Sequence, residues 1–399
     1  MAELRRVLGV GGATIVGLGA MLGTGVFAAW TPAADLAGGA LLWALALAAL
    51  VAALNATSTA ALARALPQSG GAYAYGRAYL SRPAGVVAGY AFVLGKSASA
   101  GAAALTIGAY TWPGYERVVA LGAIVLTLAL DLRGIVKSVR ATAVLVAIVL
   151  AVLGVLAVSA FARLPSLSAP TASLPDGSAV GLLAATGILF VAFAGYARIT
   201  VLGEEVRDPG RTIPRAMITS FAIVIATYVV LGAVVMLALR SGVVLTAAPL
   251  EAIAETLGSP VLAVAVRVGA VVAAGAVLLS LIAGIGRTLF AMGRGGDAPA
   301  PLARIAAATG VPALAEISAA VLAACVVLVG GIGFALALSA ALILTYYGVA
   351  HLAVLARVRR GDFPRALGVS AGLGLAGCLA VVLGLVLAAA TGAGWLGLA

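Results

Sequence analysis

The sequence predicts an all-α integral membrane protein with about eleven transmembrane helices. Of its 399 residues, 64% are hydrophobic and only 9% are charged, and the mean hydropathy is +1.20. Soluble proteins carry about 25% charged residues, and a membrane-spanning helix needs roughly 20 apolar residues in succession. Apolar stretches of that length recur along the chain, and no hydrophilic segment between them is long enough for a separate soluble domain.

These apolar stretches define eleven expected spans. Their approximate ranges are 9–31, 37–63, 84–110, 117–132, 141–162, 179–202, 216–239, 259–289, 312–330, 332–356 and 366–391. The boundary between the ninth and tenth spans depends on Gly330 and Gly331 alone, since the sequence around them is apolar on both sides. Two adjacent glycines favour a tight turn at this point.

The basic residues alternate between the two sides of the membrane. If the N-terminus lies in the cytoplasm, eighteen of the 24 basic residues fall in cytoplasmic segments, and only Arg117, Arg163 and Arg240 fall in external segments. Cytoplasmic loops of membrane proteins are enriched in Lys and Arg. We therefore expect a multi-pass protein of a bacterial cell membrane, with a cytoplasmic N-terminus and an external C-terminus. This alternation accounts for the net charge of +11, so no nucleic acid partner is expected.

The first span contains the run Gly19-Ala20-Met21-Leu22-Gly23-Thr24-Gly25-Val26-Phe27. Its three glycines weaken a helix, because each loses more backbone entropy on ordering than alanine does. Free backbone groups at membrane depth are costly unless they are buried in protein or line a watery cavity. The run therefore predicts a helix that is interrupted at mid-membrane and offers backbone groups to a ligand. The alternative is close helix packing, since Gly19 and Gly23 have the four-residue spacing of packing motifs.

A second mid-span glycine lies in the sixth span, in Phe190-Val191-Ala192-Phe193-Ala194-Gly195-Tyr196-Ala197-Arg198. Paired interruptions at corresponding positions of two inverted halves are typical of secondary transporters. The N-terminal ends of half-helices suit a carboxylate, whereas their C-terminal carbonyl groups suit an ammonium group. Together the two segments indicate a binding site for a zwitterionic amino acid.

Two loop segments accompany these spans. Pro67-Gln68-Ser69-Gly70-Gly71-Ala72-Tyr73 follows the second span, and Glu204-Glu205-Val206-Arg207-Asp208-Pro209 follows the sixth, with Ile213-Pro214-Arg215 after it. By themselves they are typical of an interfacial turn and of a solvated loop with surface ion pairs. In this order, however, the glycine run, the two loops and Phe193-Ala194-Gly195-Tyr196 resemble the motifs of the amino acid–polyamine–organocation (APC) superfamily of permeases. The resemblance covers spans one to ten.

The resemblance implies a five-plus-five inverted repeat with broken first and sixth helices, working by alternating access around a central site. It implies a ten-helix core over residues 1–358, with repeats at about 9–162 and 179–356, and an additional helix within 359–399. It implies that the first interruption holds a substrate carboxylate and the sixth-span segment holds the amino group. The candidate substrate-binding residues are Ala20, Met21, Gly23, Thr24, Gly25, Val191, Phe193, Ala194, Gly195 and Tyr196. The matching cytoplasmic loop motif contains Glu204, Glu205, Arg207 and Pro209.

The chain departs from the family pattern in two places. Most members have twelve or more spans, whereas eleven are expected here, so contacts between protomers do not follow from the resemblance. Some proton-coupled relatives carry a lysine midway along the fifth span, and the matching position here is near Val149. Proton coupling through a lysine at that position is therefore not expected.

Three basic residues lie within the expected spans: Lys96, Arg198 and Arg267. Ionisable groups at membrane depth cost roughly 2.5–3.5 kcal/mol on insertion scales, so each is a functional candidate. Lys96 and Arg198 are the candidates for coupling to a co-transported proton or sodium ion. The alternatives are structural: Arg198 pairs with an acidic residue of the following loop, and Arg267 extends to the membrane surface along its aliphatic stem.

Secondary transport of an amino acid is the function that these features favour, and the lack of deep acidic residues favours a neutral substrate. A polyamine or organic-cation carrier of the same fold and a non-transporting membrane sensor are the alternatives. An enzyme is disfavoured, because one histidine, two cysteines and no cluster of deep carboxylates leave no catalytic or metal site. No cofactor is expected, and the expected partners are the substrate, a proton or sodium ion, and the lipid bilayer.

Overall fold

The computed structural model describes residues 8–66, 70–133, 139–167, 177–200, 206–306 and 310–391. Nearly all of this part of the chain is helical, and Leu8 and Val206 form an isolated parallel bridge. Glu204 and Glu205 of the predicted loop motif lie outside the described residues, as do residues 67–69 of the other loop. The predicted all-helical fold is confirmed.

Every one of the eleven expected spans is helical. In chain order the corresponding helices are α1 (Val10–Met21) with α2 (Thr24–Ala28), α4 (Leu41–Ala65), α6 (Arg82–Thr111), α7 (Glu116–Leu132), α8 (Val139–Leu167), α9 (Ala179–Phe193) with η1 (Ala194–Tyr196) and α10 (Ala197–Thr200), α11 (Pro209–Arg240), α13 (Pro260–Arg294), α14 (Ala313–Val329), α15 (Ile332–Arg359) and α16 (Arg365–Ala390). Within the described ranges, nine of these spans are long and apolar enough to cross a membrane. The other two, α7 and α14, have 17 residues each, which is the short end of the range for a span. Gly330 and Gly331 form the predicted turn between α14 and α15.

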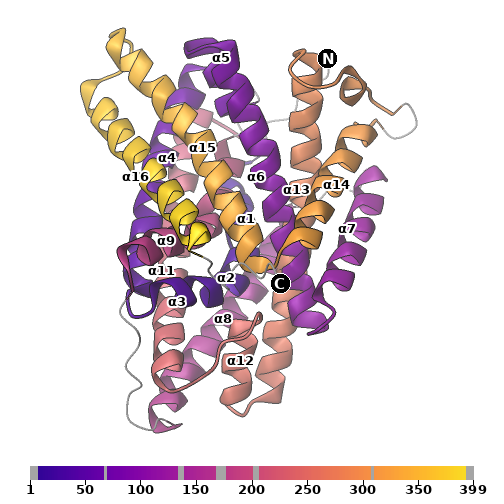
Figure 1. The fold of residues 1–399 in the computed structure, drawn as a ribbon, viewed down its shortest axis with the longest axis vertical. Helices are drawn as coiled ribbons and strands as arrows, with labels where there is room; N and C mark the ends of the chain where they lie inside the picture. Colours follow the sequence, from indigo (N-terminus) through magenta and orange to yellow (C-terminus); the bar gives the residue numbers. More distant parts are fainter. Residues whose placement is uncertain are drawn as a thin grey trace.

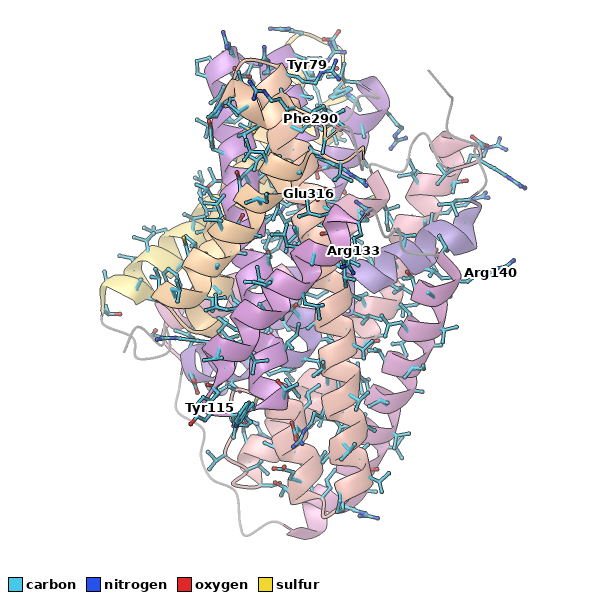
Figure 2. The ribbon with its side chains drawn as sticks, turned by 90° about the vertical axis from the view of Figure 1, so that its right-hand side faces the viewer. Tyr79, Tyr115, Arg133, Arg140, Phe290 and Glu316 are labelled. Carbon is cyan, nitrogen blue, oxygen red and sulfur yellow. The ribbon has the colours of Figure 1, made fainter. Side chains whose placement is uncertain are left out.

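In the described part of the chain, four short helices lie between the spans: α3 (Trp30–Ala37), α5 (Ala72–Tyr79), α12 (Pro249–Thr256) and η2 (Ala300–Ala303). The helix α5 lies at one end of the bundle and α12 lies at the other (Figure 1). We refer to these as the α5 end and the α12 end. Tyr79, the last residue of α5, lies at the α5 end, and Tyr115, which precedes α7, lies toward the α12 end (Figure 2).

The long helices pack in a pattern that is paired between the two halves of the chain. The first span, α1, packs against the seventh and fifth, α11 and α8, and the sixth span, α9, packs against the second and tenth, α4 and α15. If each of spans one to five is matched with its counterpart among spans six to ten, the contacts of the first span correspond to the contacts of the sixth. The third span, α6, contacts its own counterpart α13, and the fourth span, α7, contacts its own counterpart α14. Two repeats related by a pseudo-twofold axis produce this kind of pairing.

The C-terminal helix α16 packs directly on the interrupted sixth span. It contacts α9, α4 and α15, and glycines allow the close approach. A β-carbon on Gly187 of α9 would lie 2.8 Å from Leu385 of α16, closer than real β-carbon contacts. The additional helix is therefore part of the same packed bundle as the ten-helix core.

A buried polar cluster also ties α16 to α4 and α15. The ring of His351 on α15 is fully buried, with Nδ1 2.9 Å from the Ser58 hydroxyl and Nε2 2.7 Å from the Asn55 amide oxygen. Because that oxygen can only accept, Nε2 donates and a neutral ring accepts from Ser58 through Nδ1. The Cys378 thiol of α16 donates to the same Asn55 oxygen at 3.4 Å. Buried polar groups in apolar surroundings need such partners, so the cluster fixes how these three helices meet.

Candidate substrate site

The first span is interrupted where the glycine run predicted. The helix α1 ends at Met21, and the Leu22 N–H caps it by donating to the Leu18 carbonyl at 2.7 Å. Gly23 then takes a conformation that is neither helical nor extended, with φ −113° and ψ −129°, before α2 begins at Thr24. A β-carbon on Gly23 would overlap the Val277 side chain on α13. The helix is therefore interrupted at Leu22 and Gly23, and Gly23 also allows close packing against α13.

The second interruption is later and tighter than the sequence predicted. Val191 was expected within it, yet α9 continues as a regular helix through Phe193. Ala194 to Tyr196 then form a 3₁₀ turn, with the Ala194 N–H donating to the Val191 carbonyl, and α10 follows at once. A 3₁₀ turn keeps its residues hydrogen-bonded, so it frees fewer backbone groups than an open segment does. Of the predicted residues, Ala194, Gly195 and Tyr196 lie in this turn.

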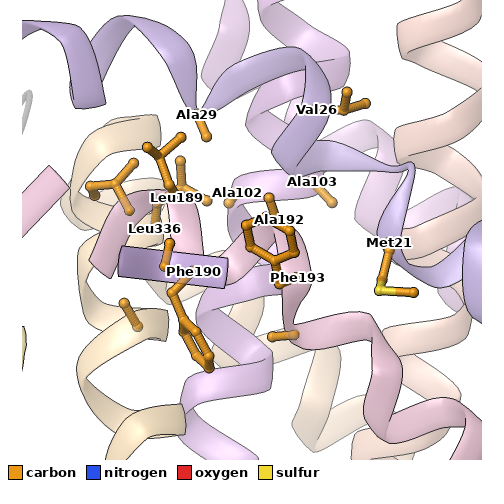
Figure 3. Close-up of a cluster of buried hydrophobic side chains, with 14 of the residues drawn as sticks. Met21, Val26, Ala29, Ala102, Ala103, Leu189, Phe190, Ala192, Phe193 and Leu336 are labelled. Atoms are coloured by element: carbon orange, nitrogen blue, oxygen red, sulfur yellow. The ribbon is translucent and has the colours of Figure 1, made fainter. Parts of the chain in front are cut away.

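The two interrupted helices cross in direct backbone contact. A β-carbon on Gly25 would lie 2.5 Å from the Cα atom of Ala192, and one on Gly195 would lie 2.5 Å from the carbonyl carbon of Ala20. Figure 3 shows Met21, Ala192 and Phe193 around this crossing, within a shell of buried apolar side chains. The structure thus brings the predicted residues of the first span together with those of the sixth.

Tyr228 of α11 bridges the two interruptions, and the sequence did not identify it. Its hydroxyl lies 2.6 Å from the Met21 carbonyl oxygen and 3.2 Å from the Ala192 carbonyl oxygen. The side chain is 1% exposed, and its ring packs edge-on against Phe193 with centroids 5.0 Å apart. A hydroxyl has one proton, so it can satisfy only one of these carbonyl groups fully at a time. Tyr228 is the only tyrosine of the seventh span, which is the one signal that could have marked it.

The two predicted aromatic residues both border the crossing. Phe193 stacks on Phe221 with centroids 6.5 Å apart, and Tyr196 lies 5.4 Å from the same ring. Tyr196 also stacks on Tyr347 of α15, with centroids 5.6 Å apart. Both side chains are fully buried, so each is part of the wall of the crossing.

Lys96 reaches the second interruption from α6. Its Nζ atom lies 3.5 Å from the Ala194 carbonyl oxygen, the first carbonyl of the 3₁₀ turn. Ser97 beside it and Thr24 at the start of α2 are 1% and 6% exposed, and their hydroxyls have no hydrogen-bond partner among the described residues. Arg198, the other predicted coupling candidate, lies in α10.

The described part of the cytoplasmic loop motif anchors the first span. The Arg207 N–H donates to the Leu8 carbonyl at 2.8 Å, next to the bridge between Leu8 and Val206. Pro209 begins α11, where its fixed φ and missing N–H suit a first helical position. The loop after the sixth span therefore fixes where α1 starts.

A cavity of about 590 Å³ opens toward the α12 end. Its lining includes Thr31, Asp35, Tyr115, Arg117 and the last residue of α2, Ala28. The cavity thus reaches the C-terminal end of α2, whose residues Thr24–Ala28 are buried.

Arg267 forms an ion pair with α12, and 45% of its side chain is exposed. Its Nε atom donates to the Glu251 Oε1 atom at 2.8 Å, and its NH2 group contacts the same oxygen. Glu251 lies in α12, so this ion pair ties the short helix to α13.

Long apolar helices, of which the first and sixth are interrupted where they cross, define the architecture of a secondary transporter. The family model of the amino acid permeases matches residues 8–394. The chain therefore belongs to the amino acid permease family and is a transporter of that family, as the resemblance to the APC superfamily predicted.

The relatives are bacterial membrane transporters. An uncharacterized transporter of Mycobacterium tuberculosis and one of Mycobacterium bovis are each 42% identical over 400 residues, covering 99% of this chain and 90% of the relative. The branched-chain amino acid permease BcaP of Bacillus subtilis is 26% identical over 339 residues, covering 76% of this chain and 70% of that protein.

The fold is similar to that of a solved Na⁺-coupled sialic acid symporter in a substrate-bound outward-open state. The two structures share 14% sequence identity with a TM-score of 0.57, covering 97% of this chain and 90% of the other. At this identity the likeness shows the fold alone.

Proposed function

We propose that this protein is a secondary active transporter that moves neutral amino acids across the cell membrane by alternating access. The observation that carries the proposal is the crossing of the two interruptions, with Gly25 against Ala192 and Gly195 against Ala20. The crossing gathers helix ends, which are the backbone groups best suited to a zwitterion. The kinship with a branched-chain amino acid permease supports the same substrate class.

The amino group of the substrate binds at the carbonyl groups of the crossing. Met21 and Ala192 present two carbonyl oxygens to one Tyr228 hydroxyl, which leaves acceptor capacity for an ammonium group. The Tyr228 oxygen itself provides a further acceptor. Val191, Phe193, Ala194, Gly195 and Tyr196 form the sixth-span side of this site.

The carboxylate of the substrate binds at the start of α2. Gly23, Thr24 and Gly25 offer N–H groups there, and the partnerless buried Thr24 hydroxyl adds a donor. Ala20 and Met21 complete the first-span side.

A neutral substrate side chain fits the composition around the crossing. The described helices α1, α2, α6, α9, α11 and α15 contain no acidic residue to balance a second positive charge. The labelled side chains around the crossing in Figure 3 are apolar. A polyamine, with several ammonium groups, would leave charges unpaired at this depth.

The α5 end faces the cytoplasm, as the distribution of basic residues indicates. The cavity toward the α12 end then lies on the external side and touches the last residue of α2, Ala28. The paired packing of the spans supports repeats at about 9–162 and 179–356.

Lys96 couples transport to a proton. Its ammonium group donates to the Ala194 carbonyl, so losing the proton replaces a charge-assisted hydrogen bond to the 3₁₀ turn with a weaker neutral one. Lys96→Met is then expected to abolish accumulation driven by a pH gradient while exchange of substrate across the membrane continues. Lys96→Arg separates the two roles, because guanidinium keeps its proton near pH 7 and would rescue a merely structural charge but not proton coupling. Accumulation driven by a sodium gradient alone would contradict this role.

Binding of a panel of amino acids and polyamines to the purified protein tests the proposal. A ligand that binds the native state raises the melting temperature by mass action. We expect neutral amino acids to stabilise the protein, and Gly23→Leu to remove the effect by filling the interruption. Gly11→Leu is the matched control, because no atom lies within 4 Å of a β-carbon at that position. Stabilisation by polyamines only, or by no member of the panel, would contradict the proposal.

A further inference from the structure

Asp297 is a buried carboxylate at the α5 end, outside the crossing. It follows α13, and its side chain is 1% exposed. The Tyr73 hydroxyl donates to Oδ2 at 2.8 Å, Arg82 Nε donates to Oδ1 at 2.8 Å, and Arg77 contacts Oδ2. The backbone carbonyl of Asp297 accepts from the Tyr90 hydroxyl at 3.0 Å.

These donors come from α5 and the start of α6. Tyr73 and Arg77 lie in α5, and Arg82 is the first residue of α6. The Arg82 guanidinium also donates to the Gly296 carbonyl at 3.0 Å. One carboxylate therefore holds two guanidinium groups and a hydroxyl of the loop between the second and third spans against the end of the eighth span. Charge-assisted hydrogen bonds of this kind are roughly twice as strong as neutral ones.

A second contact seats the other end of α5 on α15. The Ala72 N–H donates to the Tyr346 hydroxyl at 2.9 Å. Gly71 has a φ of +55°, and a β-carbon there would collide with the same hydroxyl. Tyr346 packs on Tyr347 with centroids 5.1 Å apart, and Tyr347 stacks on Tyr196 of η1. The seat of α5 is thus connected through aromatic contacts to the second interruption.

The ring of Tyr73 covers the packed layer below α5. A β-carbon on Gly89 would lie 3.0 Å from Tyr73 Cδ2 and 2.8 Å from Met292 Cε. Met292 of α13 is fully buried in this layer. The α5 helix therefore covers a packed layer at this end of the bundle.

We propose that Asp297 is a latch that holds α5 closed over the α5 end, and that α5 releases Asp297 when this end opens. Tyr73 and Arg77 leave together, since both belong to α5, whereas Arg82 is the first residue of α6. Arg77 and Arg82 are already 34% and 61% exposed, so they become solvated readily on release. The gating role rests on the proposed function, whereas the docking of α5 does not.

Thiol labelling at Met292 tests the latch without any substrate. Met292→Cys is made in a Cys325→Ser background, because Cys325 is exposed whereas Cys378 is 2% exposed. Labelling of the purified protein by a polar maleimide is expected to be slow. Removing charge-assisted hydrogen bonds with Asp297→Asn is expected to raise the labelling rate by about tenfold. Asp208→Asn is the control, since it alters an exposed ion pair with Arg211 in a different loop.

Unchanged labelling of folded Asp297→Asn would overturn the latch. If that variant fails to fold, Tyr73→Phe is tested in its place. It removes one hydrogen bond to Asp297 without changing any charge, and it is expected to raise the labelling rate by about threefold. Equal rates for Tyr73→Phe and the parent would overturn the latch as well. Faster labelling of a protein that binds no amino acid would contradict the proposed function alone and leave the docking of α5 intact.

Discussion

Gly25 of α2 lies against Ala192 of α9 so closely that a β-carbon on the glycine would be 2.5 Å from the alanine Cα atom. The contact joins the segment after the first interruption to the segment just before the second. Neither segment can shift toward the other, because packed interiors are not continuously deformable. The site is therefore built where the two helices are in close contact.

Gly25→Ala is expected to destabilise the protein and reduce uptake. The added methyl group meets backbone atoms of Ala192, which cannot rotate away, and overpacking of this kind costs about 1–3 kcal/mol. Thermal unfolding in detergent and uptake into proteoliposomes measure the two effects. Gly11→Ala is the matched control and is expected to leave the melting temperature unchanged or slightly raised, since its surroundings are open. A Gly25→Ala variant with the parent's stability and uptake would show that the crossing is looser than described.

Tyr228→Phe is expected to weaken substrate binding more than it weakens the fold. The ring keeps its packing on Phe193, but the Met21 and Ala192 carbonyl groups lose their donor, at a cost of about 1–3 kcal/mol. We expect KM for the substrate to rise by about tenfold or more, because the hydroxyl belongs to the ammonium site. Tyr115→Phe, at a ring that is 56% exposed, controls for loss of a hydroxyl elsewhere. An unchanged KM would remove Tyr228 from the site.

The sequence located the first interruption because glycine acts locally. Gly23 ends a helix through its own backbone freedom, and Gly330 with Gly331 forms a turn for the same reason. The sixth-span prediction was less accurate, since aromatic packing of Phe193 and Tyr196 keeps that segment wound as a 3₁₀ turn. That packing depends on residues of α11 and α15, which no local pattern specifies.

Contacts distant along the chain could not be predicted in this way. Tyr228 meets Met21 across 207 residues, and Tyr73 meets Asp297 across 224. A tyrosine in an apolar span and an aspartate in a loop have no periodicity that indicates a partner. Lys96 was identified only because a charge in an apolar span is costly, and its contact with Ala194 required the fold.

The Asp297 network is expected to give a characteristic pH dependence of stability. Burial raises the pKa of Asp297. Hydrogen bonds from Tyr73 and Arg82 and the charges of Arg77 and Arg82 lower the pKa by more than burial raises it, so the pKa lies below its ordinary value. A lowered native pKa adds stability above the unfolded-state pKa, and that stability is lost as the pH falls through the native pKa. The melting temperature of the parent should therefore exceed that of Asp297→Asn by a constant amount from about pH 5 to 8, and the difference should shrink below about pH 4. A difference that grew on acidification would contradict this assignment.

His351→Leu is expected to loosen the attachment of α16. The substitution removes the ring partner of the Ser58 hydroxyl and leaves the Asn55 amide oxygen with the weak Cys378 thiol donor, and a buried unsatisfied group costs about 1–3 kcal/mol. Hydrogen–deuterium exchange of α16, together with thermal unfolding, reports the change. Cys325→Ala, at an exposed thiol, should alter neither reading. Unchanged exchange in His351→Leu would mean that apolar packing alone holds this helix.

Uptake of labelled neutral amino acids into proteoliposomes tests the central claim most directly. Transport by the parent should saturate, distinguish stereoisomers and be abolished by Gly23→Leu, while Gly11→Leu retains it. That result would place substrate recognition at the crossing of the two interrupted helices. Saturable uptake that survives Gly23→Leu, or folded protein that transports no neutral amino acid, would contradict the account.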